Sequence, residues 1–217
     1  MGKKLHTASG RRFILLSLVM WCVTILFLAP FYVLIIYAFK PREATMLKNP
    51  LAFPDTLYLQ NFVEAVQKSD FLRAFTNSTV STVCGVVVLV LICSMAAYIV
   101  VRRGNNRFYG VWQYIFLASV MLPFQTIMFP LYKNLMNLHL LNSRPAYVLV
   151  SVGFQMGFDI FLYCGFIKTV PVELEEAAAI DGCSRMGTFW RIVFPLLKPV
   201  TMTVVVLSAL GIWNDYQ

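Results

Sequence analysis

The chain has 217 residues, of which 59% are hydrophobic and 13% are charged. A typical soluble domain is about 45–50% apolar and about 25% charged, so this composition excludes an ordinary globular domain and indicates a membrane protein. The net charge of +8 does not indicate nucleic-acid binding, because the basic residues lie mainly at the ends of apolar runs.

Five apolar segments are long enough to cross a bilayer, which requires about 20 mostly apolar residues. The first is too long for the core of a signal peptide and is expected to remain as an anchor. The fifth lacks a polar flank, so we expect the native chain to continue, and five is a lower limit. The sequence therefore predicts an all-α integral membrane protein, a polytopic helical bundle. The five segments cover about residues 13–39, 75–101, 109–132, 146–167 and 200–217.

Lysines and arginines precede the first segment and fill the connections between segments two and three and between four and five. If the segments alternate in direction, all these basic residues fall on one side, which the positive-inside rule identifies as the cytoplasm. The sequence thus predicts a cytoplasmic N-terminal tail over residues 1–12, a transmembrane domain over 13–217 and an outer loop at about 40–74. Residues 61–75 of this loop are amphipathic and predict a surface helix, which either packs locally or docks an external partner.

The cytoplasmic connection of about residues 168–199 is more than a spacer, because it combines acids, bases, a central glycine and two prolines. Its composition predicts two short helices joined at Gly182. Glutamates near the start of the first helix complement the helix dipole, and Thr169 and Pro171 are expected at its cap and in its first turn. Gly182 can adopt the left-handed conformation that ends a helix, and Ser184 can cap the next one.

The second helix of this loop is predicted to be amphipathic, because its apolar residues recur at the spacing i, i+3, i+4, i+7 and i+8. From the pattern alone, the helix pair could contact another protein or serve only as an interfacial anchor. The predicted apolar face consists of Met186, Phe189, Trp190, Val193 and Phe194.

Motifs in this loop carry a family resemblance. Glu176-Ala177-Ala178 with Gly182, followed by Ile192–Pro195, resembles the EAA loop of permeases in binding-protein-dependent ABC importers. The run Ile180-Asp181-Gly182 is similar to the sugar-uptake branch, the carbohydrate-uptake family 1 permeases of MalG type, although Phe194 stands where the pattern usually has leucine. Further segments that resemble this family are Phe39–Pro41, Asn61-Phe62, Asn77-Ser78, Leu122–Gln125, Pro130–Tyr132 and Trp213–Asp215.

The resemblance implies a permease subunit that forms half of the translocation pathway for a sugar or oligosaccharide in a bacterial-type inner membrane. The implied partners are a second permease subunit in a heterodimer, a cytoplasmic nucleotide-binding ATPase dimer, an extracytoplasmic solute-binding protein and membrane lipid. Such permeases have six spans, so a sixth is expected beyond Gln217. The resemblance also implies that the loop couples to the ATPase through Glu175, Glu176, Ala177, Ala178, Asp181, Gly182, Met186 and Phe189.

The chain itself is not expected to be an enzyme. It has no Walker-type GxxxxGK[ST] sequence, so ATP and Mg²⁺ would be bound by the partner ATPase subunits. No cofactor, metal ligand or catalytic residue is expected in this chain, whose two histidines lie in the N-terminal tail and in an outer connection.

Polar side chains within the apolar segments are candidates for the substrate path, because such groups are costly in a membrane and usually face a cavity or another polar group. Asp159 lies about nine residues from Lys168, near mid-bilayer, and Gln155 is one helical turn away. A sugar site needs planar polar groups for hydroxyls and aromatic faces for the ring. Each candidate could instead pack against a second permease. The candidates are Gln125, Gln155, Asp159, Trp213, Asn214 and Asp215.

Other kinds of transporter remain open at this point. A permease of the same superfamily could move a glycerol phosphate or a polyamine. A proton-coupled secondary transporter could use Asp159 as a proton carrier, but it would normally need more spans and an internal repeat, and the sequence shows neither.

Overall fold

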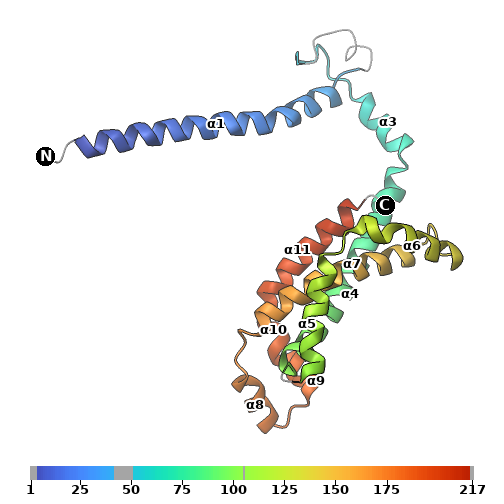
Figure 1. The fold of residues 1–217 in the computed structure, drawn as a ribbon. Helices are drawn as coiled ribbons and strands as arrows, with labels where there is room; N and C mark the ends of the chain where they lie inside the picture. The colour runs from blue at the N-terminus through green and yellow to red at the C-terminus, as the bar shows by residue number, and fades with distance from the viewer. Residues whose placement is uncertain (1–3, 42–50, 105, 216–217) are drawn as a thin grey trace. The chain divides into compact units, whose positions relative to one another are not determined.

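A computed structural model describes residues 4–41, 51–104 and 106–215, and every regular element within these ranges is a helix (Figure 1). The chain divides into two compact units, residues 1–72 and 73–217. The first unit contains α1 (Lys4–Ala38) and α3 (Gln60–Lys68). The second unit contains nearly all of α4 (Phe71–Arg102) and every later helix.

In the first unit, the start of α3 is bound to the end of α1. The side-chain amide of Asn61 donates to the carbonyl oxygens of Ala38 (3.1 Å) and Lys40 (2.7 Å). These carbonyls lie where α1 has no further intrahelical donors, so Asn61 satisfies groups that would otherwise need water. Beside these bonds the rings of Phe39 and Phe62 lie 5.3 Å apart. The Asn-Phe pair therefore has a structural role at the end of the first long helix.

The predicted amphipathic helix over residues 61–75 is shorter in the structure. It ends at Lys68, and Asp70 adopts a φ of +48°, which interrupts the helical conformation before α4 begins. As a result α4 starts at Phe71, four residues before the apolar segment predicted from residue 75.

Three of the described helices are long and apolar enough to cross a membrane, and the number reaches five if each of two bent helix pairs forms one span. The three are Arg12–Ala38, Phe71–Arg102 and α7 (Arg144–Ile167). The first bent pair covers the third predicted segment. The second bends at Leu197, before the fifth predicted segment, whose described residues 200–214 lie in one helix. The structure therefore agrees with up to five spans, of which the third is not a straight helix.

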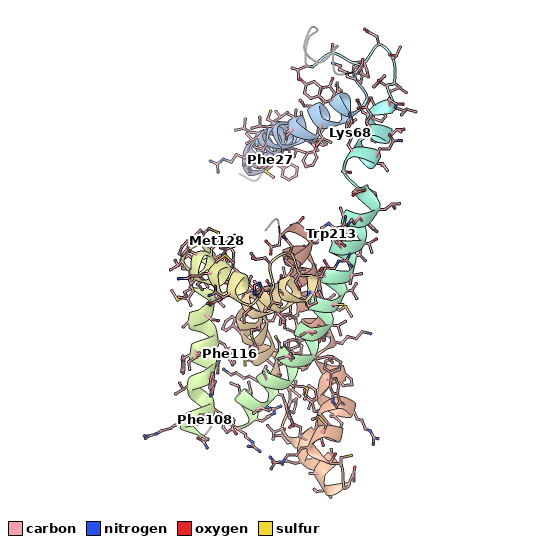
Figure 2. All side chains as sticks on the ribbon, turned by 90° about the vertical axis from the view of Figure 1, so that its right-hand side faces the viewer. Phe27, Lys68, Phe108, Phe116, Met128 and Trp213 are labelled. Atoms are coloured by element: carbon pink, nitrogen blue, oxygen red, sulfur yellow. The ribbon has the colours of Figure 1, made fainter. Side chains whose placement is uncertain are left out.

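The third predicted segment, residues 109–132, consists of two helices. These are α5 (Arg107–Val120) and α6 (Phe124–Asn137), which are bent by 95° relative to each other. Pro123 accounts for the break, because it has no N–H for an intrahelical bond and it disfavours the helical conformation at the preceding residue. Figure 2 shows Phe108 and Phe116 along α5, and Met128 on α6 where the chain has turned away.

The core of the second unit lies between α4, α7 and α11 (Lys198–Asn214). Hydrogen bonds between side chains of α7 and groups of α11 run in opposite residue order along the two helices, so these helices are antiparallel. Three bonds join the pair: Tyr147 Oη to the Ile212 carbonyl oxygen (2.8 Å), Ser208 Oγ to Asp159 Oδ2 (2.9 Å) and Tyr163 Oη to Thr201 Oγ1 (3.1 Å).

On another side, α7 packs against α5 at Gly157. A Cβ atom at this position would overlap Ser119 Oγ and would lie 3.0 Å from the carbonyl oxygen of Phe116. The absence of a side chain at Gly157 thus allows the two backbones to approach closely, as small residues do in membrane helix packing.

Candidate functional site

The loop between α7 and α11 contains two helical segments, and the first is α8 (Glu173–Ile180). Figure 1 shows α8 and α9 at the end of the second unit opposite from α6. Three glutamates occupy the first turn of α8, as the dipole argument predicts. The predicted cap was wrong, because the Thr169 hydroxyl donates to the Phe166 carbonyl oxygen (2.7 Å), and Pro171 lies before the helix rather than in its first turn.

The turn after α8 has the predicted geometry. Gly182 has a φ of +82°, in the left-handed region that L residues rarely adopt. Its N–H donates to the Ala179 carbonyl oxygen (3.1 Å), and the Cys183 N–H donates to the Ala178 carbonyl oxygen (2.9 Å). These two bonds form a Schellman motif, which satisfies the last carbonyls of α8. The predicted joint at Gly182 is confirmed.

The second helical segment begins with α9 (Arg185–Thr188), and the predicted cap is confirmed because Ser184 Oγ accepts from the Gly187 N–H at 3.2 Å. The helix then widens into a π-helix over Phe189–Val193, where the Phe194 N–H donates to the Phe189 carbonyl oxygen. A proline at position 195 follows directly and cannot donate an i to i−4 bond.

The residues of the second segment that face the core differ in part from the predicted apolar face. Phe189 and Val193 are buried as predicted, and so is Thr188, which the 3.6-residue period placed off the apolar face. Met186 is 53% exposed and Trp190 is 36% exposed. The single apolar face predicted from the sequence is therefore correct only in part.

Glu175 is bound within the chain. Its Oε1 accepts from Arg102 Nε at 2.7 Å, and its Oε2 accepts from the Tyr98 hydroxyl at 2.7 Å. The side chains of Arg102 and Glu175 are 16% and 13% exposed. Both carboxylate oxygens of Glu175 are thus bound within the chain, whereas the resemblance implies a contact between Glu175 and a partner ATPase. No spacing rule indicates this pair, and the sequence argument used the arginines after the second apolar segment only to assign orientation.

The outward face of α8 is formed by residues at helical positions i, i+1, i+4 and i+5, counted from Glu176. Ile180 is 87% exposed and stands among small or acidic neighbours, while Ala178 packs inward at 4% exposure. Ile180 was absent from the predicted coupling set, although it belongs to the quoted motif, because exposure of an apolar residue is not visible in a hydropathy pattern. The residues of this outward face are Glu176, Ala177, Ile180 and Asp181.

Beneath the loop lies a cavity of about 780 Å³. Its wall includes the inner residues of the loop, among them Glu175, Met186 and Phe189, together with Tyr98 and Arg102 from α4. Four of the predicted coupling residues therefore line this cavity, and one of them, Glu176, also lies at the edge of the outward face.

A smaller cavity of about 230 Å³ brings together two of the six predicted substrate-path residues, Gln155 of α7 and Asp215 after α11. Ser151 adds a third polar group, and the rings of Phe124 and Phe154, 5.1 Å apart, form an aromatic wall. This combination of amide, carboxylate, hydroxyl and aromatic groups is the kind that the sequence argument required of a sugar site.

The other predicted path residues lie elsewhere. Gln125 and Asn214 are exposed. Trp213 is 43% exposed and contacts Phe75 at a ring distance of 5.7 Å, and Figure 2 shows it beside α4. Asp159 is fully buried between α7 and α11. Among the described residues, no group of three or more His, Cys, Asp or Glu side chains could hold a metal ion.

Residues 89–216 match the model of the family described as binding-protein-dependent transport system inner membrane component. The chain belongs to this family. It is 35% identical over 194 residues to a probable starch degradation products transport system permease protein of Thermoanaerobacterium thermosulfurigenes, covering 89% of this chain and 70% of the relative. It is 34% identical to the melibiose/raffinose/stachyose import permease protein of Bacillus subtilis, covering 98% of this chain and 75% of the relative.

A solved structure supports the same fold for this inner membrane component. A chain of a bacterial ABC transporter involved in import of the acidic polysaccharide alginate matches all of this chain and 74% of its own length, with a TM-score of 0.78 and 21% identity. The predicted all-α permease fold and the predicted family are both confirmed, and the protein is a multi-pass membrane permease.

In this permease component, Asp159 lies buried in the contact between α7 and α11. Its Oδ2 accepts from Ser208, and its Oδ1 has no hydrogen-bond partner among the described residues. Since the side chain is fully buried and absent from the wall of the smaller cavity, we assign it to the α7–α11 contact.

This assignment makes a prediction about Asp159. Asp159→Asn retains an oxygen that can accept from Ser208, whereas Asp159→Leu leaves the Ser208 hydroxyl unpaired in an apolar interior. We expect the leucine variant to lose about 1–3 kcal/mol of folding stability and the asparagine variant to lose less. Thermal denaturation of the purified protein in detergent measures both. Adding Ser208→Ala should recover much of the loss in the leucine variant, and equal melting temperatures for all variants would contradict the assignment.

Proposed function

We propose that this permease forms half of the translocation pathway for a sugar or oligosaccharide in an ABC importer. The sugar class is supported by the substrates for which two relatives are named, starch degradation products and melibiose, raffinose and stachyose. It is also supported by the smaller cavity, where polar groups lie beside an aromatic pair. The N-terminus lies in the cytoplasm, in agreement with the distribution of lysines and arginines.

In this proposal the chain works with a second permease, a cytoplasmic ATPase dimer and an extracytoplasmic binding protein. The ATPase subunits bind ATP and Mg²⁺ and supply the hydrolysis. Closure of their dimer moves the loop helices and turns the permease pair between inward-facing and outward-facing states. The smaller cavity, with Gln155 and Asp215, is part of the wall along which the sugar passes.

The observation that carries the coupling role is the outward face of α8. This helix ends in a fixed turn at Gly182 and presents an apolar side chain, Ile180, at 87% exposure next to the carboxylates of Glu176 and Asp181. An exposed apolar anchor with a charged rim is typical of a binding hot spot. We assign this face to the ATPase, with Ile180 entering an apolar groove and Glu176 meeting a basic group.

The test uses the tagged full-length permease expressed with its partners and purified in mild detergent. Mass spectrometry of the wild-type complex should find a second permease, a nucleotide-binding subunit and a solute-binding protein. Glu176→Lys and Ile180→Asp should each lower recovery of the nucleotide-binding subunit about tenfold, which corresponds to about 1.4 kcal/mol of binding free energy.

Matched controls separate this effect from misfolding. Glu176→Asp keeps the charge and Ile180→Leu keeps the apolar character, so both should retain most of the ATPase subunit. Normal recovery in the lysine and aspartate variants would remove the docking role from this face. A purified complex that imports a non-sugar solute instead would leave the coupling role intact and replace the substrate class.

A further inference from the structure

A cluster of polar bonds holds α8 against the cytoplasmic end of α4. Both carboxylate oxygens of Glu175 are used, one by Arg102 Nε and one by the Tyr98 hydroxyl, each at 2.7 Å. Arg102 Nη2 also donates to the carbonyl oxygen of Val170 at 2.9 Å, in the segment that leads into α8. The cluster therefore fixes both the helix and its entry to the same turn of α4.

Apolar packing of α8 cannot replace this attachment. The helix has eight residues, and Ala178 is the single buried one. An alanine buries little surface, so the orientation of α8 depends on directional bonds. Charge-assisted hydrogen bonds with both acceptor atoms occupied define an orientation better than an exposed ion pair does.

Tyr98 also reaches the other side of the Gly182 turn. Its ring lies 5.1 Å from the ring of Phe189, the first residue of the π-helix, and Phe189 is 2% exposed. The same side chain thus contacts α8 through its hydroxyl and the second helical segment through its ring. A Cβ atom at Gly182 would meet nothing within 4 Å, so the turn is held by its two backbone hydrogen bonds and not by packing against this position.

We propose that Arg102 and Tyr98 are positioning residues that lock the coupling loop to α4. A displacement of the outward face of α8 then moves α4 with it and is not absorbed by the turn at Gly182. This role rests on the proposed function, because it concerns the transfer of motion from the ATPase to the permease core. Glu175 is the inner attachment of the loop, and its neighbour Glu176 is on the outer, docking side.

The first test measures mobility and requires no substrate. A nitroxide attached to a cysteine at position 177 on the outward face of α8 reports the motion of that helix in the full chain in nanodiscs, with the native cysteines replaced by serine or alanine. Arg102→Met should increase the mobility of the label clearly. Arg103→Met is the matched control, because Arg103 is exposed and bonds Tyr109 instead, and it should leave the spectrum unchanged.

The second test measures transport in the reconstituted complex. Arg102→Met and Glu175→Gln should each lower sugar transported per ATP hydrolysed at least fivefold, with the ATPase subunit still attached. Tyr98→Phe keeps the ring contact with Phe189 and should lower the ratio only about twofold. The double variant of Arg102 and Glu175 should be no worse than the worse single variant, because the two residues act through one contact.

Each outcome has a separate meaning. An unchanged label spectrum in Arg102→Met overturns the lock, whatever the transport result. Additive losses in the double variant would also overturn the lock. So would a lower protein yield with a normal ratio of sugar transported to ATP hydrolysed, because the cluster would then have only a general structural role. A wild-type complex that moves no sugar while the label behaves as expected contradicts the proposed function and leaves the lock supported.

Discussion

Gly182→Pro is expected to abolish uptake, with a loss of about a hundredfold or more. Gly182 has a φ of +82°, whereas proline fixes φ near −65°, and proline also removes the N–H that donates to the Ala179 carbonyl oxygen. The incompatible conformation and the lost bond together cost about 3 kcal/mol or more, which shifts the conformational equilibrium of the loop by more than a hundredfold. Uptake of labelled sugar by cells that express the complete importer measures the effect.

A graded series at this position separates the backbone effect from other causes. Gly182→Asn should retain most activity, because asparagine tolerates the left-handed conformation, and Gly182→Ala should fall between asparagine and proline. Gly165→Ala is a control in α7, since a Cβ atom there meets nothing within 4 Å. Membrane insertion should be the same for all of these variants. Uptake by the proline variant at the wild-type level would show that the turn is not needed for coupling.

Gly157→Ala is expected to destabilise the permease core strongly. The new Cβ atom would overlap Ser119 Oγ and approach the Phe116 carbonyl oxygen to 3.0 Å, and a backbone atom cannot move aside as a side chain can. Overpacking of this kind costs about 1–3 kcal/mol. For a chain of this size the melting temperature should fall by about 5 °C, and the yield of assembled complex should fall with it. Thermal unfolding in detergent is the measurement.

A control and a suppressor are available on the same helices. Gly153→Ala places a Cβ atom in open space in α7 and should leave the melting temperature unchanged. Ser119→Gly removes the hydroxyl and the Cβ that meet the new methyl group, so it should restore part of the loss, while the contact with the Phe116 carbonyl remains. If Gly157→Ala and Gly153→Ala have the same melting temperature, the close contact between α5 and α7 does not contribute to stability.

The features that the sequence predicted correctly are those encoded by neighbouring residues. A glycine that ends a helix and a serine that caps the next one act over three or four positions, so Gly182 and Ser184 could be placed without tertiary information. The long apolar runs likewise indicate spans by themselves. The hydropathy pattern predicts one continuous segment across the bend after α5, because its window averages over Pro123, although this proline is a helix breaker that can interrupt a span.

Features that depend on tertiary neighbours could not be placed in advance. Arg102 and Glu175 are 73 positions apart, and no spacing rule connects them. A hydropathy pattern puts Asp159 and Gln155 inside the membrane, but it does not tell a packed interface from a cavity wall. The distinction appears only when α11 is in place, since Ser208 of α11 bonds Asp159 and Asp215, directly after α11, lines the cavity.

The three hydrogen bonds between α7 and α11 have a consequence for how these helices find their alignment. In a bilayer the apolar faces of two helices gain little from each other relative to lipid, so apolar contact discriminates poorly between sliding positions. A shift of one turn would separate the hydroxyls of Ser208 and Tyr163 from their acceptors and leave them in hydrocarbon. These few polar side chains therefore select one longitudinal alignment among many, because each shifted alignment leaves hydroxyl groups without a hydrogen-bond partner in the bilayer.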